Sequence, residues 1–424
     1  MRVHLWYGKD GLDVELPDAN VRGVLTHRPA PRLEDPVSAI ERALREPIGT
    51  APLEQLARGR KDACIVICDL TRPVPNRLTL PPMLNALNRA GISDEAVTVL
   101  IATGTHRPNV GHEVRELVGE EVESRVRIEN HYCEQSRCRD YGVTPRGTPV
   151  LLNRIYTDAD VKITAGMIEP HFMAGYAGGR KMVMPGVAGL ASVLHWHGPE
   201  FLEHPLATNG ELVGNPVHEE ALFIARMARP DFILDVTLDG SKQINGVFAG
   251  DMEAAWEAGV AFSAQQTTAT IAEPVDIVLT TSGGYPLDLT YYQVVKGMVG
   301  ALPIVKPGGT IVLAAACAEG VGNAVFRENL LRWKRLEDFM DSITRPGAVF
   351  ASDQWQIEEL ARCVRHNEVV HVCEGIDRET HERLFVRPAD SVEAAMAYAL
   401  RKHGANATIA AIPAGPYVTA KLAG

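Results

Sequence analysis

Cysteine is scarce in this chain of 424 residues, which has seven cysteines and no C-x-x-C pair. An odd number without that spacing gives no sign of a disulfide framework. Cys64, Cys68 and Cys317 lie in or beside apolar runs, so we interpret them as buried free thiols. Cys133 and Cys138 form a loop pair, for which use as metal ligands or as a disulfide stays open.

Long apolar segments and positive charge are also lacking. No apolar run approaches the roughly 20 residues that a membrane-spanning helix needs, and the first residues show no signal-peptide core, so we expect a cytoplasmic protein without a membrane partner. The formal net charge of −11 disfavours a general nucleic-acid binder. An anionic substrate would therefore have to be attracted by local basic residues. The 46% hydrophobic and 22% charged content is ordinary for a soluble enzyme of two or three domains.

Seven short β-rich segments alternate with amphipathic helical stretches. Alternation of this kind predicts an α/β fold with mostly parallel sheets. Residues 231–248 differ, because Asp239-Gly240 between two alternating runs predicts a hairpin. The predicted strands are 63–68, 97–102, 161–165, 275–280, 310–316, 368–373 and 407–412.

A polar segment, 265–274, follows a predicted helix at 254–264 and is the expected domain boundary. We predict two α/β domains flanking a central cleft, the usual place for a small-molecule site. Residues 1–268 would form an N-terminal cofactor-binding domain. Residues 269–424 would form a C-terminal domain that closes the substrate cleft. No internal repeat or low-complexity tract interrupts this division.

Two of the strands run directly into short basic motifs. D-L-T-R-P-V-P follows 63–68 and contains Asp69 and Arg72, and its prolines stop the strand and stiffen the loop. A fixed arginine can clamp a carboxylate with two hydrogen bonds. The alternative is an Asp-Arg pair that only ties down the loop. G-T-H-R-P follows 97–102 and places His106 where a substrate could approach, although a lone histidine there is more often structural.

The densest motif follows the strand at 161–165. It contains Glu169, His171 and a glycine-rich turn ending in Lys181. Gly178 and Gly179 permit close backbone approach, and basic residues beside exposed N–H groups would suit a phosphate. The turn fits neither G-x-x-x-x-G-K-[ST] nor a clean G-x-G-x-x-G, which disfavours an ordinary nucleotide-binding loop. Tight strand-to-helix packing is the alternative use of these glycines.

His195 and His197 are two residues apart, so on a helix at most one of them would face the site. Imidazole suits nickel, zinc, copper and iron, and the spacing is not H-E-x-x-H, which disfavours a metalloprotease. A single-histidine metal site becomes reasonable if an organic cofactor supplies the remaining ligands.

A second group of polar side chains lies in the C-terminal half. Asp288 is a plausible N-cap, and Tyr292, Gln293 and Lys296 would share one face of the following helix. Together they could bind a carboxylate, although a solvated lysine beside a half-buried tyrosine is the simpler interpretation. Trp355 is either packing or a wall of the cleft.

Taken together, these motifs resemble the nickel-dependent lactate racemase family from about Asp69 to Trp355. The matching set is D-x-T-R-P, G-T-H-R-P, E-P-H with a glycine-rich turn ending in lysine, a histidine sixteen residues later, Y-Q-x-x-K-G and D-x-W. The resemblance implies a nickel-pincer nucleotide, a pyridinium dithio mononucleotide carrying Ni(II), and proteins that synthesise it as partners. It also implies reversible hydride transfer at C2 of lactate or a related 2-hydroxy acid.

The resemblance assigns a role to each motif. Lys181 would be covalently attached to the cofactor, with Asp69, Gly178 and Gly179 beside it. His197 would be the nickel ligand. His106 and His171 would be the paired acid and base. The substrate-binding residues would be Arg72, Gln293, Lys296, Tyr292 and Trp355.

We therefore predict a racemase or epimerase of 2-hydroxy acids. A hydride route avoids a carbanion next to an anionic carboxylate, and the intact motif set argues for an active enzyme. Two alternatives stay open. A nicotinamide-dependent 2-hydroxyacid dehydrogenase would need added NAD and no nickel, whereas a metal- or nucleotide-responsive binding protein would tolerate loss of His106 and His171.

Overall fold

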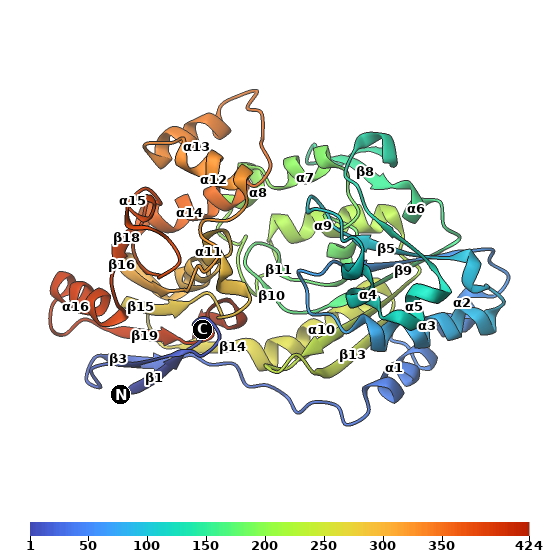
Figure 1. Ribbon diagram of the computed structural model, residues 1–424, viewed down its shortest axis with the longest axis horizontal. Coiled ribbons are helices and arrows are strands. Elements are labelled where there is room, and N and C mark those ends of the chain that lie inside the picture. The colour runs from blue at the N-terminus through green and yellow to red at the C-terminus, as the bar shows by residue number, and fades with distance from the viewer. Residues whose placement is uncertain (424) are drawn as a thin grey trace.

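The computed structural model describes residues 1–423, and its N-terminal half is built on a six-stranded sheet (Figure 1). All neighbouring pairs in this sheet are parallel except β12 and β13, which form the predicted antiparallel hairpin. The strand order is β13 (Ile244–Gly250), β12 (Phe232–Leu238), β9 (Val161–Met167), β4 (Ala63–Cys68), β5 (Val97–Ala102) and β6 (Arg127–Asn130).

The C-terminal half contains a second six-stranded sheet, which is parallel throughout. Its edge strand β3 comes from the N-terminal end of the chain, so the chain starts beside the C-terminal sheet before it crosses to the other half (Figure 1). The strand order is β18 (Arg387–Ala389), β17 (Glu368–Val372), β16 (Val305–Ala314), β15 (Val275–Thr281), β19 (Ile409–Ile412) and β3 (Val21–Val24).

Four two-stranded sheets complete the strand pairing. The pair β14 and β20 is parallel and joins the end of the N-terminal half to the C-terminal end of the chain, whereas the other three pairs are antiparallel. The pairs are β1 (Arg2–Leu5) with β2 (Leu12–Glu15), β7 (Cys138–Val143) with β8 (Pro149–Asn153), β10 (Pro170–His171) with β11 (Gly175–Tyr176), and β14 (Thr268–Ile271) with β20 (Thr419–Leu422).

Helices surround both large sheets. Those of the N-terminal half are α1 (Pro36–Arg45), α2 (Leu53–Ala57), α3 (Asn76–Ala90), α4 (His112–Val118), α5 (Glu120–Arg125), α6 (Arg154–Thr157), α7 (Leu190–Trp196), α8 (Pro199–Leu202), α9 (Pro216–Ala228) and α10 (Met252–Thr267). Those of the C-terminal half are α11 (Tyr291–Ala301), α12 (Ala324–Leu331), α13 (Leu336–Thr344), α14 (Gln354–His366), α15 (Arg378–His381) and α16 (Val392–His403).

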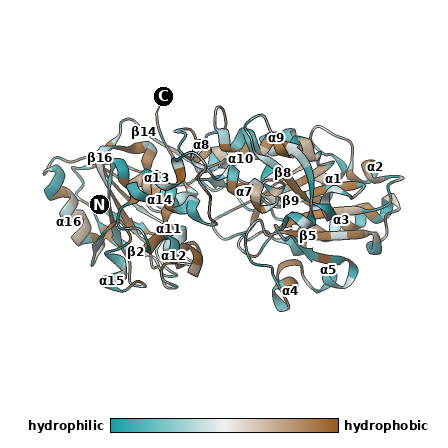
Figure 2. Cartoon of the chain, turned by 90° about the horizontal axis from the view of Figure 1, so that it is seen from above, coloured by the Kyte–Doolittle hydropathy of each residue, from teal (hydrophilic) through white to brown (hydrophobic). Residues whose placement is uncertain are grey.

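The central strands form because their side chains are apolar on both faces. In β4 the sequence A-C-I-V-I-C is buried at its first five positions, and β5 has the same pattern. Continuous apolar runs are typical of parallel strands that carry helices on both sides. Figure 2 accordingly shows hydrophobic residues along the strands and hydrophilic residues on outward-facing helix surfaces.

The predicted α/β class is confirmed, and each of the seven predicted strands is a strand of one of the large sheets. The sequence did not predict the position of β3 in the second sheet. The expected boundary segment, 265–274, holds the end of α10 and all of β14. The division into domains 1–268 and 269–424 stays a prediction, with β1–β3 packed in the C-terminal half.

Candidate functional site

Three motifs meet because the strands that precede them are neighbours. In the sheet, β4 lies between β9 and β5, and Cys68 at its end pairs with Ala102 of β5. The chain leaves all three parallel strands at the same edge, which brings Asp69, His106 and His171 to one side of the sheet. The site is thus built on the carboxyl ends of rigid, buried strands.

His106 is oriented by Asp69. Its Nδ1 lies 2.7 Å from Asp69 Oδ2, and the Asp69 carboxylate also accepts from the backbone N–H and the hydroxyl of Thr71. Burial acts to raise the pKa of Asp69, but the hydrogen bonds from His106 and Thr71 outweigh burial and the pKa is lowered. An ionised Asp69 holds the proton on His106 Nδ1. Nε2 of this half-exposed imidazole is therefore left to accept a proton.

His171 contacts the amine of Lys181. Nδ1 of His171 accepts from the backbone N–H groups of Met173 and Ala174, so its proton lies on Nε2. That Nε2 lies 2.9 Å from Lys181 Nζ, and an N–H can donate only to an unprotonated amine. Burial, followed by nearby cationic groups, lowers the pKa of both residues well below their ordinary values. Lys181 is therefore a neutral nucleophile in this arrangement.

Cationic side chains from both halves surround this pair. Arg72 Nε lies 3.7 Å from Glu169 Oε1, and Lys296 Nζ lies 5.6 Å from the centre of the Phe172 ring. Burial first, and Arg72 second, lower the pKa of Lys296 to about 7. The charges of Arg72 and Lys296 both depress the pKa of Lys181. An anion at this point would relieve their mutual repulsion.

The glycine-rich turn packs against the protein itself. A Cβ on Gly178 would lie 2.8 Å from Asp235 Oδ2, and one on Gly179 would lie 2.7 Å from the Trp256 ring. The N–H of Gly179 donates to Asp235, and the buried Arg180 guanidinium lies 4.0 Å from the centre of the Trp256 ring. The N–H of Gly179 and the guanidinium of Arg180 are therefore engaged within the protein, and close packing accounts for both glycines, while the place of Gly178 and Gly179 beside a cofactor stays a prediction.

His197, and not His195, faces the C-terminal half. Its ring stacks on Trp355 at 4.4 Å between centroids, and its Nδ1 donates to the carbonyl of Val193 at 2.9 Å. Burial lowers the pKa of His197 to about 3, so the imidazole is neutral with Nε2 available to a metal. His195 instead contacts the hydroxyl of Thr148 through Nδ1. Only one of the two histidines is therefore placed as a ligand, as the spacing predicts.

Helix α11 presents Tyr292 and Gln293 beside Trp355. The Tyr292 hydroxyl donates to Asp353 Oδ1 at 3.1 Å and accepts from Trp355 Nε1 at 3.0 Å. Asp353 has φ of 65°, an unfavourable conformation for a residue that is not glycine, at the start of α14. The side-chain oxygen of Gln293 is buried without a hydrogen-bond partner among the described residues. Tyr292 and Trp355 are therefore held in place by their hydrogen bond, and the side-chain oxygen of Gln293 beside them is free to accept a hydrogen bond.

One sequence prediction in this region is wrong. Asp288 does not cap α11, because the helix begins at Tyr291 with Thr290 at its N-cap. The Asp288 carboxylate instead accepts from the backbone N–H groups of Gly8 and Ala316. It thereby ties the N-terminal segment to the end of β16.

Several residues at the site were not assigned a role from the sequence. Glu169 pairs with Arg72. Tyr417 lies near this pair: burial is the main cause of its raised pKa, the charge of Glu169 raises the pKa further, and the charge of Arg72 lowers it. Both polar atoms of the buried Asn76, at the start of α3, lack a partner among the described residues. The E-P-H motif was a signal for Glu169, whereas nothing in the sequence pattern marks Tyr417. Cys133 and Cys138 are free cysteines.

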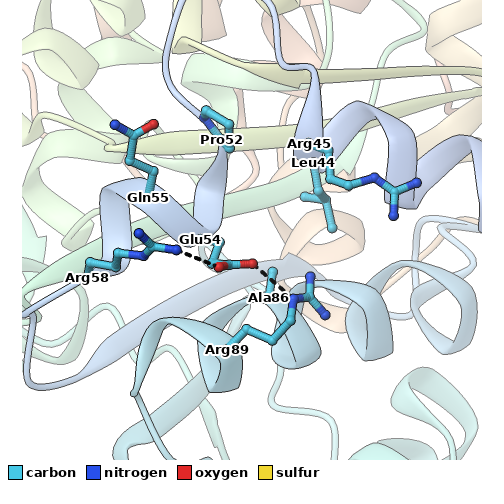
Figure 3. Close-up of a pocket in the computed structure, with 8 residues that line it drawn as sticks. All are labelled: Leu44, Arg45, Pro52, Glu54, Gln55, Arg58, Ala86 and Arg89. Carbon is cyan, nitrogen blue, oxygen red and sulfur yellow. Dashed lines mark hydrogen bonds and ion pairs between the residues drawn. The ribbon is translucent and has the colours of Figure 1, made fainter.

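Two surface pockets lie away from these residues. One lies between α1, α2 and α3, where Glu54 pairs with Arg58 at 2.9 Å and with Arg89 at 3.0 Å (Figure 3). The other is lined by residues of α8 and of the segment that ends at Phe350. The first pocket has three arginines and one carboxylate, and neither pocket is lined by a histidine, cysteine or lysine that could act as a base or a nucleophile, so the strand-end site is the better candidate for chemistry.

Comparisons with known proteins agree with the motif set. The family model of the lactate racemase N-terminal domain matches residues 7–210, and that of the C-terminal domain matches residues 270–419. The chain belongs to the lactate racemase family. It is 35% identical to a lactate racemase of Lactiplantibacillus plantarum, over 99% of both chains. It is 36% identical to one of Thermoanaerobacterium thermosaccharolyticum, over 97% of both chains.

Solved structures support the fold. The lactate racemase apoprotein from Thermoanaerobacterium thermosaccharolyticum superposes with a TM-score of 0.93 at 35% identity, covering 99% of this chain and all of that one. A protein from Thermotoga maritima, at 19% identity and a TM-score of 0.66 over 91% of this chain, shares the fold alone. Full-length agreement with this family makes the chain an isomerase of the racemase class. In the described residues, no helix is long and apolar enough to cross a membrane.

Proposed function

We propose that this protein racemises lactate, or a closely related 2-hydroxycarboxylate, by reversible hydride transfer with a nickel-pincer nucleotide covalently attached at Lys181. The observation that carries the proposal is the neutral amine of Lys181, 2.9 Å from His171 and close to His197, Arg72 and Lys296. A tether, a metal ligand, a base and two cations thus lie together at the junction of the two halves.

The residues fit such a cofactor. The unprotonated amine of Lys181 could attack an activated acyl or thioacyl carbon, forming the C–N bond as the bond to the activating group breaks and the amine proton passes to solvent. His197 offers Nε2 to nickel, while its Nδ1 hydrogen bond to a carbonyl fixes the ring, as is usual for histidines that bind metals. When bound, the cofactor supplies a group that accepts a hydride from C2 of the substrate and returns it.

The two histidines handle the proton of the substrate hydroxyl. His106 has a free Nε2 backed by an ionised Asp69, which suits it to take that proton and to return it. His171 follows β9, two strands away from β5, and its Nε2–H would supply a proton to the substrate oxygen, so the two imidazoles would act as base and acid. General acid-base help of this kind is worth about 10²–10⁴-fold in rate.

The substrate carboxylate is held by residues from both halves. Arg72 and Lys296 supply positive charge, and Gln293 adds an amide close to Lys296 on α11. Tyr292 and Trp355 limit the space for the group on C2, since each is fixed by a hydrogen bond to the other. An anchored carboxylate allows the planar 2-keto acid to expose either face without leaving the site.

The function is tested with deuterium at C2. The chain is co-expressed with cofactor-synthesis proteins and incubated with L-lactate carrying deuterium at C2. We expect a mixture of both enantiomers, with deuterium retained at C2, because hydride transfer does not exchange with water. Loss of label to solvent would exclude the hydride route. Turnover that needs added NAD would indicate a dehydrogenase, and binding without turnover would indicate a binding protein.

A further inference from the structure

Outside the strand-end site, two cysteines and a histidine meet in the C-terminal half. Cys317 follows β16, His371 lies within β17 and Cys373 directly follows β17. The two strands are paired in parallel with Leu313 opposite His371, so both loops leave the sheet at the same edge. Cys317 and His371 are fully buried and Cys373 is partly exposed.

The spacing of the three side chains suits one metal ion. One ligand atom from each residue lies within 4.8 Å of the other two, and Cys317 Sγ lies 3.9 Å from His371 Nε2. Tetrahedral zinc with bonds of about 2.3 Å to sulfur and about 2.0 Å to nitrogen separates sulfur from nitrogen by about 3.6 Å. The separation of Cys317 and His371 is therefore within a few tenths of an ångström of this value, and the other two separations of at most 4.8 Å would shorten when the side chains close on an ion.

His381, the last residue of α15, supports the cluster from outside. Its Nε2 lies 2.9 Å from His371 Nδ1, and its Nδ1 lies 3.7 Å from Cys373 Sγ. A single proton arrangement satisfies both contacts. His371 donates through Nδ1, His381 donates through Nδ1 to a thiolate, and Nε2 of His371 keeps its lone pair. Outer hydrogen bonds of this kind orient the histidines and thiolates that bind metals.

The backbone holds Cys317 in an unusual conformation. Its φ is 51°, and its N–H donates to the carbonyl of Asp288 at 2.8 Å. Gly375 packs against the Cys317 carbonyl and donates its N–H to Ala316 at 3.0 Å, and no other residue would fit there. Non-glycine residues with positive φ are costly and concentrate at functional sites. The two loops thus fix the thiol instead of leaving it free to turn away.

We propose that Cys317, Cys373 and Nε2 of His371 bind one zinc ion, with His381 as their outer hydrogen-bond partner. Two thiolates and an imidazole are a donor set that zinc accepts readily, and a water molecule would complete a tetrahedral site. Binding releases the thiol protons to solvent. The ion would clamp the loop after β16 to β17 and, through His381, to α15. Tyr291 of α11 packs on His371, and the site shares no residue with the one at Lys181 and His197.

The test uses the full-length chain, expressed without cofactor-synthesis proteins, reduced and freed of metal with a chelator. The wild type and His197→Ala are each titrated with zinc or with cobalt(II). The variant shows how much of the bound metal is held by His197. We expect one zinc equivalent that persists in His197→Ala, and a strong near-ultraviolet cobalt–thiolate absorption. Cys317→Ser with Cys373→Ser should abolish both. His381→Gln should weaken zinc binding about 10- to 100-fold.

Cys133→Ser with Cys138→Ser is the matched control, because it removes two thiols that lie elsewhere, and it should keep the zinc equivalent. A measurement on the wild type needs no substitution: zinc should slow alkylation of Cys373 by iodoacetamide. The proposal is overturned if the double serine variant at 317 and 373 retains the zinc equivalent, if cobalt gives no thiolate absorption, or if zinc leaves the alkylation rate unchanged. A stable disulfide between Cys317 and Cys373 under mild reduction also overturns it.

Discussion

The two halves of this protein contribute to the site in different ways. The N-terminal half supplies His106, His171 and Lys181 from loops and turns that follow β5 and β9, the two strands on either side of β4. The C-terminal half supplies Lys296 and Tyr292 from one helix: Lys296 lies over Phe172 of the other half, and Tyr292 bonds to Trp355, which stacks on His197. The proposed function thus assigns proton transfer and the cofactor to one half, and much of the substrate recognition to the other.

This difference predicts how substitutions divide. Changes at His106, His171 and Lys181 should lower kcat, because these side chains would act on the reacting atoms or on the cofactor. Arg72 of the same half, in contrast, would bind the carboxylate and affect KM. Changes in the C-terminal half should mainly raise KM. A substitution that reverses this division would show that the two halves do not have separate tasks.

The largest effect should come from His197→Ala. We expect loss of bound nickel and of detectable lactate racemisation, since Nε2 of His197 is the proposed protein ligand. His195→Ala is the matched control, because its ring contacts Thr148 instead of Trp355, and it should retain most of the nickel. Metal analysis of both purified variants checks this, and equal nickel contents would contradict it.

The next largest effect should come from His106→Ala. We expect kcat to fall about 10²–10⁴-fold with KM changed only a few-fold, because the general base is removed while the carboxylate site is intact. Asp69→Asn should give a smaller fall in kcat, since the imidazole is kept but its orienting carboxylate is lost. Steady-state kinetics in both directions measure this, and an unchanged kcat in His106→Ala would remove it from the mechanism.

An intermediate effect is expected for Lys296→Gln. Loss of a charged hydrogen-bond donor should raise KM for lactate about 10- to 100-fold. Because the pKa of Lys296 is lowered to about 7, the wild-type amine is charged below that pH and neutral above it. The wild-type KM should therefore increase as pH rises through 7, whereas the variant should lose this step.

Lys306→Gln controls for the removal of a lysine, because Lys306 is partly exposed and pairs with Asp276. It should keep both the wild-type KM and its pH dependence. A step in KM near pH 7 that survives in Lys296→Gln would assign it to another group.

The smallest effect should come from Tyr292→Phe. Removing the hydroxyl leaves Trp355 Nε1 without its acceptor and Asp353 without one donor. We expect a loss of stability of about 1 kcal/mol and a rise in KM of only a few-fold. Thermal unfolding and kinetics, compared with Tyr285→Phe on the exposed surface, measure both, and a large fall in kcat would place Tyr292 in the chemistry.

Much of the fold could be predicted from the sequence because each strand is a short continuous apolar segment that can be recognised without knowing its partners. The motifs after β4, β5 and β9 were visible for the same reason: each begins where an apolar run ends. Pairings between distant segments were not visible. The pairing of β3 with β19 depends on contacts across almost the whole chain. The partners of Asp288 are likewise far apart, which is why a cap was expected instead.

The site shows the same limit. Spacing predicted that only one of His195 and His197 faces the site, and the family resemblance selected His197. Neither could show that Asp235 accepts from the N–H of Gly179 or that Arg180 stacks on Trp256. The group formed by Cys317, His371, Cys373 and His381 has no recognisable spacing, since its members come from three different segments. Only the strand order brings them together.

The most direct test of the central claim is the intact mass and nickel content of the chain after co-expression with cofactor-synthesis proteins. We predict a covalent adduct of a nickel-bearing nucleotide in the wild type, located at Lys181 by peptide mapping and absent from Lys181→Ala. Wild-type protein that racemises lactate at full rate while unmodified and free of nickel would contradict the account.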